Sequence, residues 1–368
     1  MPSAQGLPGF SVPPAPGGVN KPSLRVDFAP AIGESGRRSP DPRLPMTRTA
    51  LIFGISGQDG AYLARLLLEK GYAVHGTSRD AAQQGFANLA CLGVRERLVL
   101  HSATPTDFHS VFQVIRRVAP DEIYNLSGQS SVGLSFDEPA ETLQSIVMGM
   151  LNMLESVRVV GAPMRLYHAC SSDCFGNTGE KPATEETAFR PRSPYGVAKA
   201  AAFWEVANYR ESYGLFACSG INFNHESPLR HARFVTRKIV AAACRIAGGS
   251  GERLKLGNIA VARDWGWAPE YVEAMWRMLQ QESPQDFIVA TGQTRRLEDF
   301  VAGAFAAVGL DWRDHVDSDP ALLRPTDLSV SAGDPGKAER LLGWRATMMM
   351  DDVVAAMVAA ERGQSRPS

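Results

Sequence analysis

The sequence predicts an α/β fold in which a doubly wound parallel sheet is joined to a smaller C-terminal α/β region. From residue 48 on, short apolar runs alternate with amphipathic helical patterns, as in parallel sheets that helices cover on both faces. The first apolar run, 49–53, leads into a glycine-rich turn made of Gly54, Ile55, Ser56, Gly57, Gln58, Asp59 and Gly60. A helical pattern follows directly. Strand, glycine turn and helix in this order are the context of a dinucleotide fingerprint, so we expect a Rossmann-type sheet.

The predicted elements follow one another in a regular order. Apolar runs predict strands at 49–53, 72–76, 98–101, 122–126, 164–169 and 217–223. Helical periodicity fills the intervals and predicts helices at 60–70, 108–118, 141–159 and 194–213. After residue 223 the elements become shorter, with Pro, Gly, Trp and Arg between them. We therefore expect a dinucleotide-binding domain at 47–223, a smaller substrate-binding region at 224–360 that is interleaved with it, and a tail at 361–368.

Charge, hydropathy and cysteine content restrict the class of protein. The 368 residues carry a formal net charge of −1, so the overall charge does not favour nucleic acid or an anionic membrane as a partner. No uninterrupted apolar stretch reaches the ~20 residues that span a bilayer. The five cysteines lack a CxxC spacing, and the scattered histidines form no metal motif. We expect a cytoplasmic protein, since free thiols fit a reducing compartment, and we expect no metal site.

Residues 1–46 differ in composition from everything that follows. They are rich in Pro, Gly and Ser, show no sustained periodicity, and lack the apolar core of a signal peptide. Met46 stands directly before the first predicted strand. We interpret the segment either as a disordered extension or as the result of a start codon assigned too early, and expect no chemistry in it.

Tyr195 and Lys199 lie one turn apart in the helical pattern at 194–213. An ammonium next to a phenol favours the phenolate, so this arrangement should bring the loss of the phenolic proton nearer to neutrality. Combined with the glycine turn, the pair predicts a site that oxidises an alcohol by hydride transfer to a dinucleotide. Without Tyr195, the ordinary interpretation of Lys199 would be a solvated helix lysine.

Longer strings of the sequence point to one family. The most specific are Asn-His-Glu-Ser-Pro at 224–228 and Arg-Asp-Trp-Gly at 263–266, and Arg-Ser-Pro-Tyr at 192–195 belongs with them. On these strings the chain, over roughly residues 48–345, resembles the GDP-mannose 4,6-dehydratase family of extended short-chain dehydrogenase/reductases. The resemblance implies that residues 224–360 mainly bind a nucleotide sugar.

The resemblance also implies a reaction. Tyr195, helped by Lys199, takes the proton of the sugar 4-hydroxyl while a hydride passes to the nicotinamide, and Ser171 bonds the 4-oxygen. A carboxylate then removes the C-5 proton, water leaves from C-6, and the hydride returns to C-6 to give a 4-keto-6-deoxy sugar. The substrate would be GDP-mannose or a related GDP-manno-heptose.

The carboxylate is where this sequence departs from the family. The family has Thr-Ser-Glu, whereas this chain has Ser171, Ser172 and Asp173. Asp173 is one methylene shorter than Glu, and a general base must come within hydrogen-bond distance of the proton it removes. Either the backbone lies closer and Asp173 still acts, or a water relays the proton, or dehydration is lost. In the last case the protein would be a GDP-sugar 4-reductase or epimerase. A loop aspartate that caps a turn is the ordinary alternative.

NADP is the cofactor that the resemblance implies. Arg79, at the end of the second predicted strand, matches the arginine that the family directs at the 2′-phosphate. The second arginine of that pair is Asp80 here, which leaves NAD as the alternative. Thr104 and Glu141 also replace residues that the family places near the cofactor. The implied cofactor contacts are the seven residues of the glycine turn, Arg79, Leu126, Ser127, Gly128, Gln129, Ser130, Tyr195, Lys199, His225 and Arg230.

The resemblance further implies the residues that bind the GDP-sugar and the state of assembly. The matching substrate residues are Asn224, Lys238, Arg263, Arg324 and Asp327. Arginine suits this role because its planar fork binds phosphate bidentately. Asp327 stands where the family has a glutamate that contacts guanine. The family forms dimers, so we expect a homodimer, with a tetramer as the alternative, although residues 80–85 differ from the segment that helps to form family tetramers.

Overall fold

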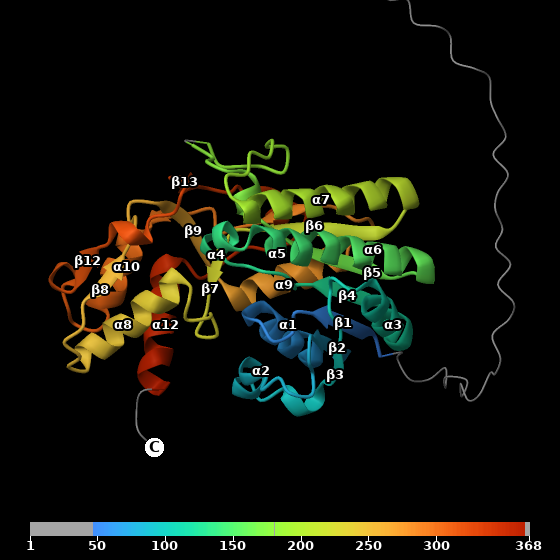
Figure 1. The fold of residues 1–368 in the computed structure, drawn as a ribbon, viewed down its shortest axis with the longest axis horizontal. Helices are drawn as coiled ribbons and strands as arrows, with labels where there is room; N and C mark the ends of the chain where they lie inside the picture. Colours follow the sequence, from blue (N-terminus) through green and yellow to red (C-terminus); the bar gives the residue numbers. More distant parts are fainter. Residues whose placement is uncertain (1–46, 180, 365–368) are drawn as a thin grey trace, which may run out of the picture. The chain divides into compact units, whose positions relative to one another are not determined.

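The computed structural model describes residues 47–179 and 181–364, so the predicted extension at 1–46 and the last part of the predicted tail lie outside the described residues. Seven parallel strands form the main sheet, in the order β10-β6-β5-β4-β1-β2-β3 (Figure 1). This order confirms the predicted Rossmann-type fold. The strands are β1 (Thr49–Phe53), β2 (Ala73–Ser78), β3 (Val99–Ser102), β4 (Glu122–Asn125), β5 (Arg165–Ser171), β6 (Phe216–Asn222) and β10 (Phe287–Val289).

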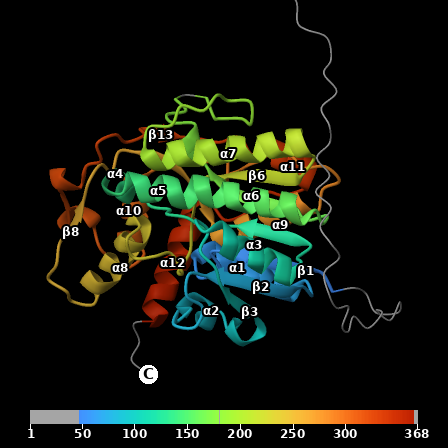
Figure 2. The same ribbon diagram turned by 45° about the vertical axis from the view of Figure 1, so that its right-hand side comes forward.

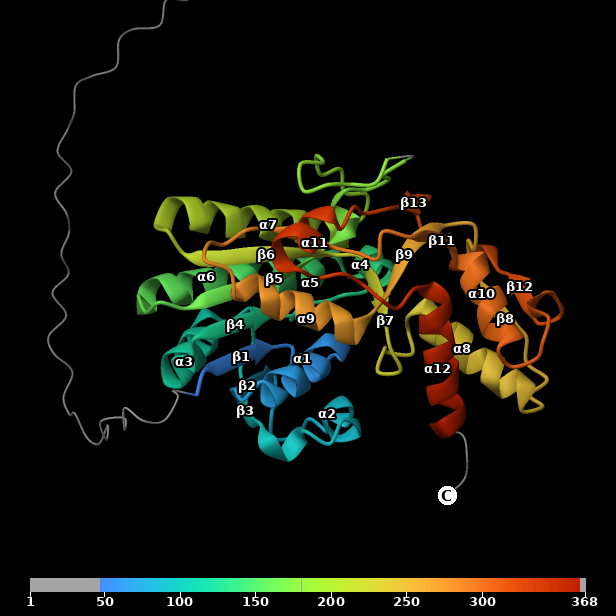
Figure 3. The same cartoon turned by 180° about the vertical axis from the view of Figure 1, so that it is seen from behind.

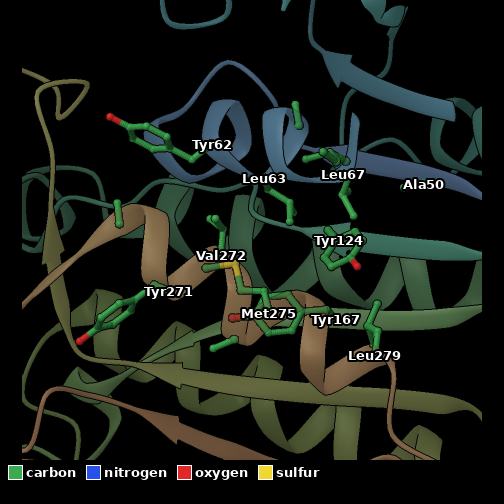
Figure 4. Packing of buried hydrophobic residues seen from close by; sticks show 14 of the residues in the cluster. Ala50, Tyr62, Leu63, Leu67, Tyr124, Tyr167, Tyr271, Val272, Met275 and Leu279 are labelled. Atoms are coloured by element: carbon green, nitrogen blue, oxygen red, sulfur yellow. The ribbon is translucent and has the colours of Figure 1, made fainter. Parts of the chain in front are cut away.

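Helices cover both faces of this sheet (Figure 2). Side chains of β1 alternate between the two faces: Ala50 and Ile52 join one buried cluster, and Leu51 and Phe53 join the other. The first face is covered by α1 (Gln58–Glu69) and α9 (Ala268–Leu279), whose apolar residues meet over the strands in Figure 4. The second face is covered by α3 (Phe108–Val118), α6 (Gly149–Val160) and α7 (Pro194–Tyr213).

Local capping signals explain why three elements begin and end where the sequence predicts. The strand at 49–53 and the helices at 108–118 and 194–213 have the predicted bounds. Asp107 caps α3 by accepting hydrogen bonds from two backbone N–H groups. Ser193 caps α7 by accepting one hydrogen bond, from the backbone N–H of Gly196; the helix starts with Pro194, and its C-cap is Gly214, with a positive φ of 67°.

The predicted helix at 141–159 is interrupted. It consists of α5 (Pro139–Leu143), a π-helical segment Gln144–Met148, and α6. In this segment Ile146 is buried, and a side chain at Gly128 would meet its Cγ1 at 3.0 Å, whereas Met148 is exposed. The contact with the distant Gly128 leaves no trace in the helical period of the sequence. The predicted strand at 164–169 also runs two residues further, so β5 ends at Ser171.

The rest of the chain builds a second, smaller region around its own core. Strand β9 (Ala262–Trp267) pairs with β11 (Thr294–Arg296), β13 (Val330–Ser331) and β7 (Asn224–Glu226), and β12 (Val316–Ser318) pairs with β8 (Leu254–Leu256). Helices α8 (Val235–Ala247), α10 (Leu297–Ala306) and α12 (Met350–Gln364) pack together here (Figure 3). The short helices are α2 (Ala87–Cys91), α4 (Val132–Asp137) and α11 (Gly336–Leu342).

The two predicted domains share elements. Helix α9 and strand β10 come from the second half of the sequence but complete the first sheet. The described residues from Thr47 on form one compact unit, so the division at 223/224 stays a prediction. Helix α12 continues to Gln364, past the predicted start of the tail at 361.

Candidate active site

The glycine turn between β1 and α1 leaves backbone N–H groups open to a ligand. Gly54 has a φ of +84°, and a side chain there would come within 2.6 Å of the Leu126 carbonyl oxygen. A side chain at Gly60 would meet the Gly54 carbonyl oxygen at 2.4 Å. Gly57 is the N-cap of α1, and no side chain caps this helix. Free N–H groups at a helix N-terminus attract anions, so the turn fits a dinucleotide pyrophosphate.

An ion pair ties the turn to the segment after β6. His225 donates from Nδ1 to the Phe223 carbonyl oxygen at 2.7 Å, and its Nε2 lies 3.0 Å from Asp59 Oδ2. Since both ring nitrogens face acceptors, the protonated imidazole satisfies both. Burial lowers the pKa of His225, but the charge and hydrogen bond of Asp59 raise this pKa by a larger amount, so the net shift is upward. Burial raises the pKa of Asp59, but the charge and hydrogen bond of His225 outweigh the effect of burial and lower this pKa to about 2.

Ser171 and Asp173 lie at the carboxyl end of β5. The strand ends at Ser171 and turns at once into a 3₁₀ segment, Ser172–Cys174. Ser171 Oγ donates to Asp173 Oδ2 at 3.2 Å and accepts from the Asp173 N–H at 3.3 Å. Burial raises the pKa of Asp173, although the positive charges of Arg263 and Arg324 oppose the shift. A carboxylate with a raised pKa is a stronger base, as proton abstraction requires.

Tyr195 and Lys199 reach the same place from the first two turns of α7. Lys199 Nζ donates to the Ala169 carbonyl oxygen at 2.6 Å and lies 5.8 Å from the centre of the Tyr195 ring. Burial and the negative charge of Asp173 raise the pKa of Tyr195, and a hydrogen bond with Ser171 offsets this only in part. This direction is opposite to the expectation from the Tyr–Lys spacing, because the phenolate loses its hydration and faces a carboxylate.

A cavity of about 410 Å³ brings most of the predicted site residues together. Its lining includes all four predicted catalytic residues and all five predicted substrate residues. From the predicted cofactor set it includes Asp59, Leu126, Ser127, Gly128, Ser130, His225 and Arg230, in addition to Tyr195 and Lys199. The described residues that line the cavity do not include Arg79, Gln129 or the other six residues of the glycine turn.

Gln129 faces away from the cavity. Its Nε2 donates to the Ser131 carbonyl oxygen at 2.8 Å and to Thr142 Oγ1 at 3.1 Å. These bonds fix the loop between β4 and α4, so the structure gives Gln129 a supporting position behind the predicted cofactor wall.

Arg79 and Asp80 lie at the end of β2, where both are exposed. Asp80 Oδ1 accepts hydrogen bonds from the backbone N–H groups of Ala82 at 3.0 Å and Gln83 at 3.1 Å. The aspartate thus caps its own turn, and Arg79 is left as the charged side chain that can reach outward from this strand end.

The predicted substrate residues line the cavity on the side of the second region. Arg263 on β9 pairs with Asp327 at 3.1 Å, and Arg324 lies 3.6 Å from the same carboxylate oxygen. Lys238 on α8 donates to the Lys255 carbonyl oxygen at 2.8 Å. Asn224 belongs to β7. Asp264, the next residue in the sequence, accepts hydrogen bonds from the backbone N–H and the hydroxyl of Thr291. Of these two adjacent charged residues, Arg263 lines the cavity and Asp264 does not.

The sequence did not single out several cavity residues. They include Val132, Arg233, Lys255 and Val261. Glu226 is also a missed member: it is buried, accepts from Thr236 Oγ1 at 2.6 Å, and lies 3.2 Å from Arg230 Nε. The signal that could have found it is its place inside the specific string at 224–228.

Two features of the described residues bear on metal and membrane binding. No cluster of three or more His, Cys, Asp and Glu side chains in the described parts of the chain could hold a metal ion. Within the same residues, no helix combines the length and the apolar character needed to cross a bilayer.

Known proteins match this sequence over most of their length. The family model described as GDP-mannose 4,6 dehydratase matches residues 51–357. GDP-mannose 4,6 dehydratase 1 of Arabidopsis thaliana is 44% identical over 321 residues, which cover 84% of this chain and 89% of the relative.

Solved structures with lower sequence identity share the fold. Thermus thermophilus UDP-glucose 4-epimerase in complex with NAD has a TM-score of 0.74 at 24% identity and covers 86% of this chain and 99% of its own. RMD from Pseudomonas aeruginosa complexed with NADPH has a TM-score of 0.71 at 22% identity, and the match covers 87% of this chain and 99% of the other. These structures support the fold alone. The family match and the Arabidopsis relative show more: the chain belongs to the GDP-mannose 4,6-dehydratase family.

Proposed function

We propose that the protein removes water from GDP-mannose to form the GDP-4-keto-6-deoxy sugar, with a nicotinamide dinucleotide that takes up a hydride and returns it. The observation that carries the proposal is the convergence of Ser171, Asp173, Tyr195 and Lys199 on one cavity whose far side holds two arginines. A phenol, a hydroxyl and a carboxylate together supply the proton transfers of an oxidation followed by an elimination. Membership of the family supports the same substrate.

Each residue has one task in this reaction. Tyr195 would accept the proton of the sugar 4-hydroxyl once the positive charge of the oxidised nicotinamide offsets the raised pKa of its phenol, and Ser171 would donate a hydrogen bond to the 4-oxygen. Asp173 removes the proton from C-5, which the adjacent ketone makes acidic, and water leaves from C-6. Ser171 Oγ donates to Asp173 Oδ2 at 3.2 Å, so the hydroxyl and the carboxylate lie together before substrate arrives. Lys199, which donates to the Ala169 carbonyl oxygen, would bind the nicotinamide ribose.

NADP is the cofactor that these residues fit best. The chemistry it supplies is reversible uptake of a hydride at the nicotinamide ring. The glycine turn would hold its pyrophosphate, and Arg79 would pair with the 2′-phosphate. Asp80 does not oppose this choice in the structure, because its carboxylate is engaged by two backbone N–H groups. Several related structures contain NAD and one contains NADPH, so they support a nicotinamide dinucleotide without separating NADP from NAD.

The activity is tested by incubating the protein with GDP-mannose and, separately, with GDP-manno-heptose. Loss of one water by mass, without net change in NADPH absorbance, is the expected result for the accepted substrate. Net oxidation or reduction of the cofactor without loss of water would instead support a 4-reductase. Tyr195→Phe should abolish turnover and leave GDP-mannose binding largely intact, because the phosphate and base contacts lie elsewhere. A Phe variant that turns over at more than a few per cent of the parent rate would remove Tyr195 from the mechanism.

A homodimer is the assembly we propose, formed through α5, α6 and α7. These helices lie side by side in Figures 1 and 2. Together with the π-helical segment that joins α5 to α6, they carry the exposed apolar side chains Leu143, Met148, Val197 and Trp204. Glu205 on α7 has a buried Oε2 without a hydrogen-bond partner among the described residues, and burial raises its pKa to about 7. A second copy would cover this apolar face by a two-fold axis.

Sedimentation velocity tests the assembly. Trp204→Asp should yield a monomer, whereas Leu341→Asp on α11, also exposed and apolar, should not change the sedimentation coefficient. A Trp204 variant that sediments like the parent would exclude this face. A cytoplasmic location stays a prediction from the composition.

A further inference from the structure

Two cysteines lie on either side of the proposed catalytic residues Ser171 and Asp173. Cys170 is in the last part of β5, and Cys174 ends the 3₁₀ segment that follows this strand. Their sulfur atoms are 3.5 Å apart, and both side chains are buried. A disulfide bond is about 2.05 Å long, so the two sulfurs would have to approach by about 1.5 Å. The thiols are therefore close enough for a disulfide to form after a small movement.

Both thiols also contact helix α7. Cys170 Sγ lies 3.8 Å from the Lys199 carbonyl oxygen, and Cys174 Sγ lies 3.8 Å from the Gly196 carbonyl oxygen. A side chain at Gly196 would meet the Asp173 carbonyl oxygen at 2.8 Å, so the 3₁₀ segment packs directly on the helix. The two sulfurs therefore lie between the end of β5 and the helix that carries the proposed acid–base residues.

A bond between the sulfurs would move the 3₁₀ segment and leave the strand in place. Cys170 is paired with Ile221 of β6, and β5 is hydrogen-bonded to β4 on its other edge. The pairing of β5 with β6 stops at Ser171, so Cys174 lies on the part of the chain that is freer to move. Asp173 directly precedes Cys174 and would move with it. Its hydrogen bonds with Ser171, at 3.2 and 3.3 Å, would then lengthen.

A small oxidant can reach the pair through the cavity. Of the two cysteines, Cys170 lines the cavity and Cys174 does not. Burial and the hydrogen bond with Cys170 raise the pKa of the Cys174 thiol, so its reactive thiolate forms less readily. Burial lowers the pKa of Lys199, and thiolate charge at the two cysteines opposes this shift, so the lysine ammonium is close enough to stabilise a thiolate. We expect an oxidant to attack Cys170 first.

We propose that Cys170 and Cys174 form a reversible disulfide when a peroxide enters the cavity, and that this bond inactivates the site by displacing Asp173. The Cys170 thiolate attacks one peroxide oxygen, the O–O bond breaks, and a sulfenic acid and one water result. Cys174 then attacks the sulfenic sulfur, the S–S bond forms, and the second oxygen leaves as water. Two electrons and two protons thus pass from the thiols to the peroxide.

The reverse reaction needs a reducing thiol, which attacks the disulfide and takes its place as the oxidised partner. In a reducing compartment such a bond is transient, as expected of a switch. The loss of activity rests on the proposed function, because Asp173 is the proposed base of that reaction. The formation of the disulfide does not.

The test treats the full-length protein with hydrogen peroxide, blocks the remaining thiols with iodoacetamide, and analyses the unreduced tryptic peptides by mass spectrometry. Cleavage after Arg165 gives one peptide that contains both cysteines. After peroxide this peptide should have lost two hydrogen atoms and should carry no alkyl group. Turnover of the same sample should fall by about tenfold or more, since the base is displaced, and dithiothreitol should restore both the thiols and the turnover.

Three variants, each compared with its own untreated sample, separate this pair from other oxidation. Cys170→Ala removes the thiol that lines the cavity and should keep its turnover in peroxide. Cys174→Ala removes the second thiol, so Cys170 should gain oxygen in place of the disulfide. Cys91→Ala is the matched control, because it removes an exposed cysteine on α2, and it should respond to peroxide like the parent.

Any of three results would overturn the proposal. They are a parent peptide that keeps both thiols at a peroxide concentration that oxidises Cys91, a complete disulfide with unchanged turnover, and a Cys170→Ala variant that peroxide inactivates like the parent. Should the Ala variants not fold, Cys170→Ser and Cys174→Ser replace them, and the peptide analysis of the parent needs no variant.

Failure of the proposed function is a separate result. Turnover is measured with whichever GDP-sugar the reduced parent accepts, by loss of water or by change in cofactor absorbance. A parent that forms the disulfide and loses this turnover, but removes no water from GDP-mannose when reduced, would contradict the proposed function and support the switch.

Discussion

Each end of the parallel sheet has a buried or cavity-lining carboxylate, and the two carboxylates differ in how many side chains donate hydrogen bonds to them. At the amino end, Glu122 of β4 is buried and accepts hydrogen bonds from Tyr72 at 3.0 Å, Tyr124 at 2.7 Å and Gln280 at 3.1 Å. Arg48 adds an ion pair at 3.2 Å. At the carboxyl end, Asp173 follows β5 and receives one side-chain hydrogen bond, from Ser171.

This difference indicates which carboxylate stabilises the fold and which can act as a base in the reaction. Glu122 has its charge satisfied on both oxygens by groups just before β1, just before β2, on β4 and in the segment after α9. It has no capacity left for a ligand. Asp173 faces a cavity, and burial raises its pKa although two arginines act against the shift. A partly satisfied carboxylate next to a cavity can still take up a proton from a ligand, and the parallel sheet places it where ligands bind.

The largest expected effect is on chemistry, from Asp173→Asn. Loss of water from GDP-mannose should fall by about 10²–10⁴-fold, because the amide cannot take the C-5 proton. Hydride transfer should remain, so reduced cofactor should accumulate in a single turnover, measured by its absorbance. Asp173→Glu should keep activity if the cavity accepts the longer chain. If the Asn variant dehydrates at a near-parental rate, Asp173 is a structural residue like Glu122 and the contrast between the two ends disappears.

The second effect is on stability, from Glu122→Ala. This change leaves the hydroxyls of Tyr72 and Tyr124 without their acceptor, and the free energy of unfolding should fall by about 2–4 kcal/mol. Turnover per folded molecule should stay at the parent value well below the melting temperature. Urea titration followed by activity assay measures both. The exposed Glu282→Ala is the control and should change stability by less than about 0.5 kcal/mol. A Glu122 variant with parental stability and reduced turnover would reverse the assignment.

The third effect is on the pH dependence of stability. It comes from the ion pair between Asp59 and His225, which stabilises the fold at the carboxyl end of the sheet. The pKa of Asp59 is depressed to about 2, so its contribution is present above the ordinary aspartate pKa and is lost as pH falls through 2. The pKa of His225 is raised, so its contribution is complete below the ordinary histidine pKa and is lost as pH rises through the folded value. The pair therefore stabilises most between about pH 4 and 6.5.

Asp59→Asn measures this contribution. The parent should exceed the variant by about 1–2 kcal/mol in unfolding free energy at pH 5, and the difference should shrink at pH 9. Unfolding by urea at the two pH values gives the comparison. If the parent and the variant differ in unfolding free energy by the same amount at pH 5 and at pH 9, His225 is not protonated in the folded protein.

The smallest effect is expected at Arg79, the exposed residue at the end of β2. Arg79→Ala should weaken NADP binding by about tenfold and leave NAD binding unchanged, since it removes one charge-assisted contact with the 2′-phosphate. Stability should not change, because the side chain is exposed. Fluorescence titration with both dinucleotides measures the ratio. A variant that loses affinity for both equally would place Arg79 on a part of the cofactor that NAD and NADP share.

The sequence by itself determined the parts of this protein that depend on neighbours in the chain. The strand at 49–53 and the capped helices at 108–118 and 194–213 were predicted with their bounds, because periodicity and caps act over a few residues. The glycine turn was predicted in the right place, although α1 begins at Gln58, two residues before the predicted start at 60. The family strings determined which residues to examine, and the cavity brings together all the predicted catalytic and substrate residues.

Only the tertiary structure decided how these side chains are engaged. It turned Gln129 toward Thr142, engaged Asp80 in its own turn, directed Lys199 to the Ala169 carbonyl, and raised the pKa of Tyr195 where the local pattern indicated the opposite. It also gave Glu122 side-chain partners on both oxygens and opened Asp173 to the cavity. The physical reason is that burial and hydrogen-bond partners come from residues far along the chain, so the charge state and reactivity of a side chain are properties of the packed site.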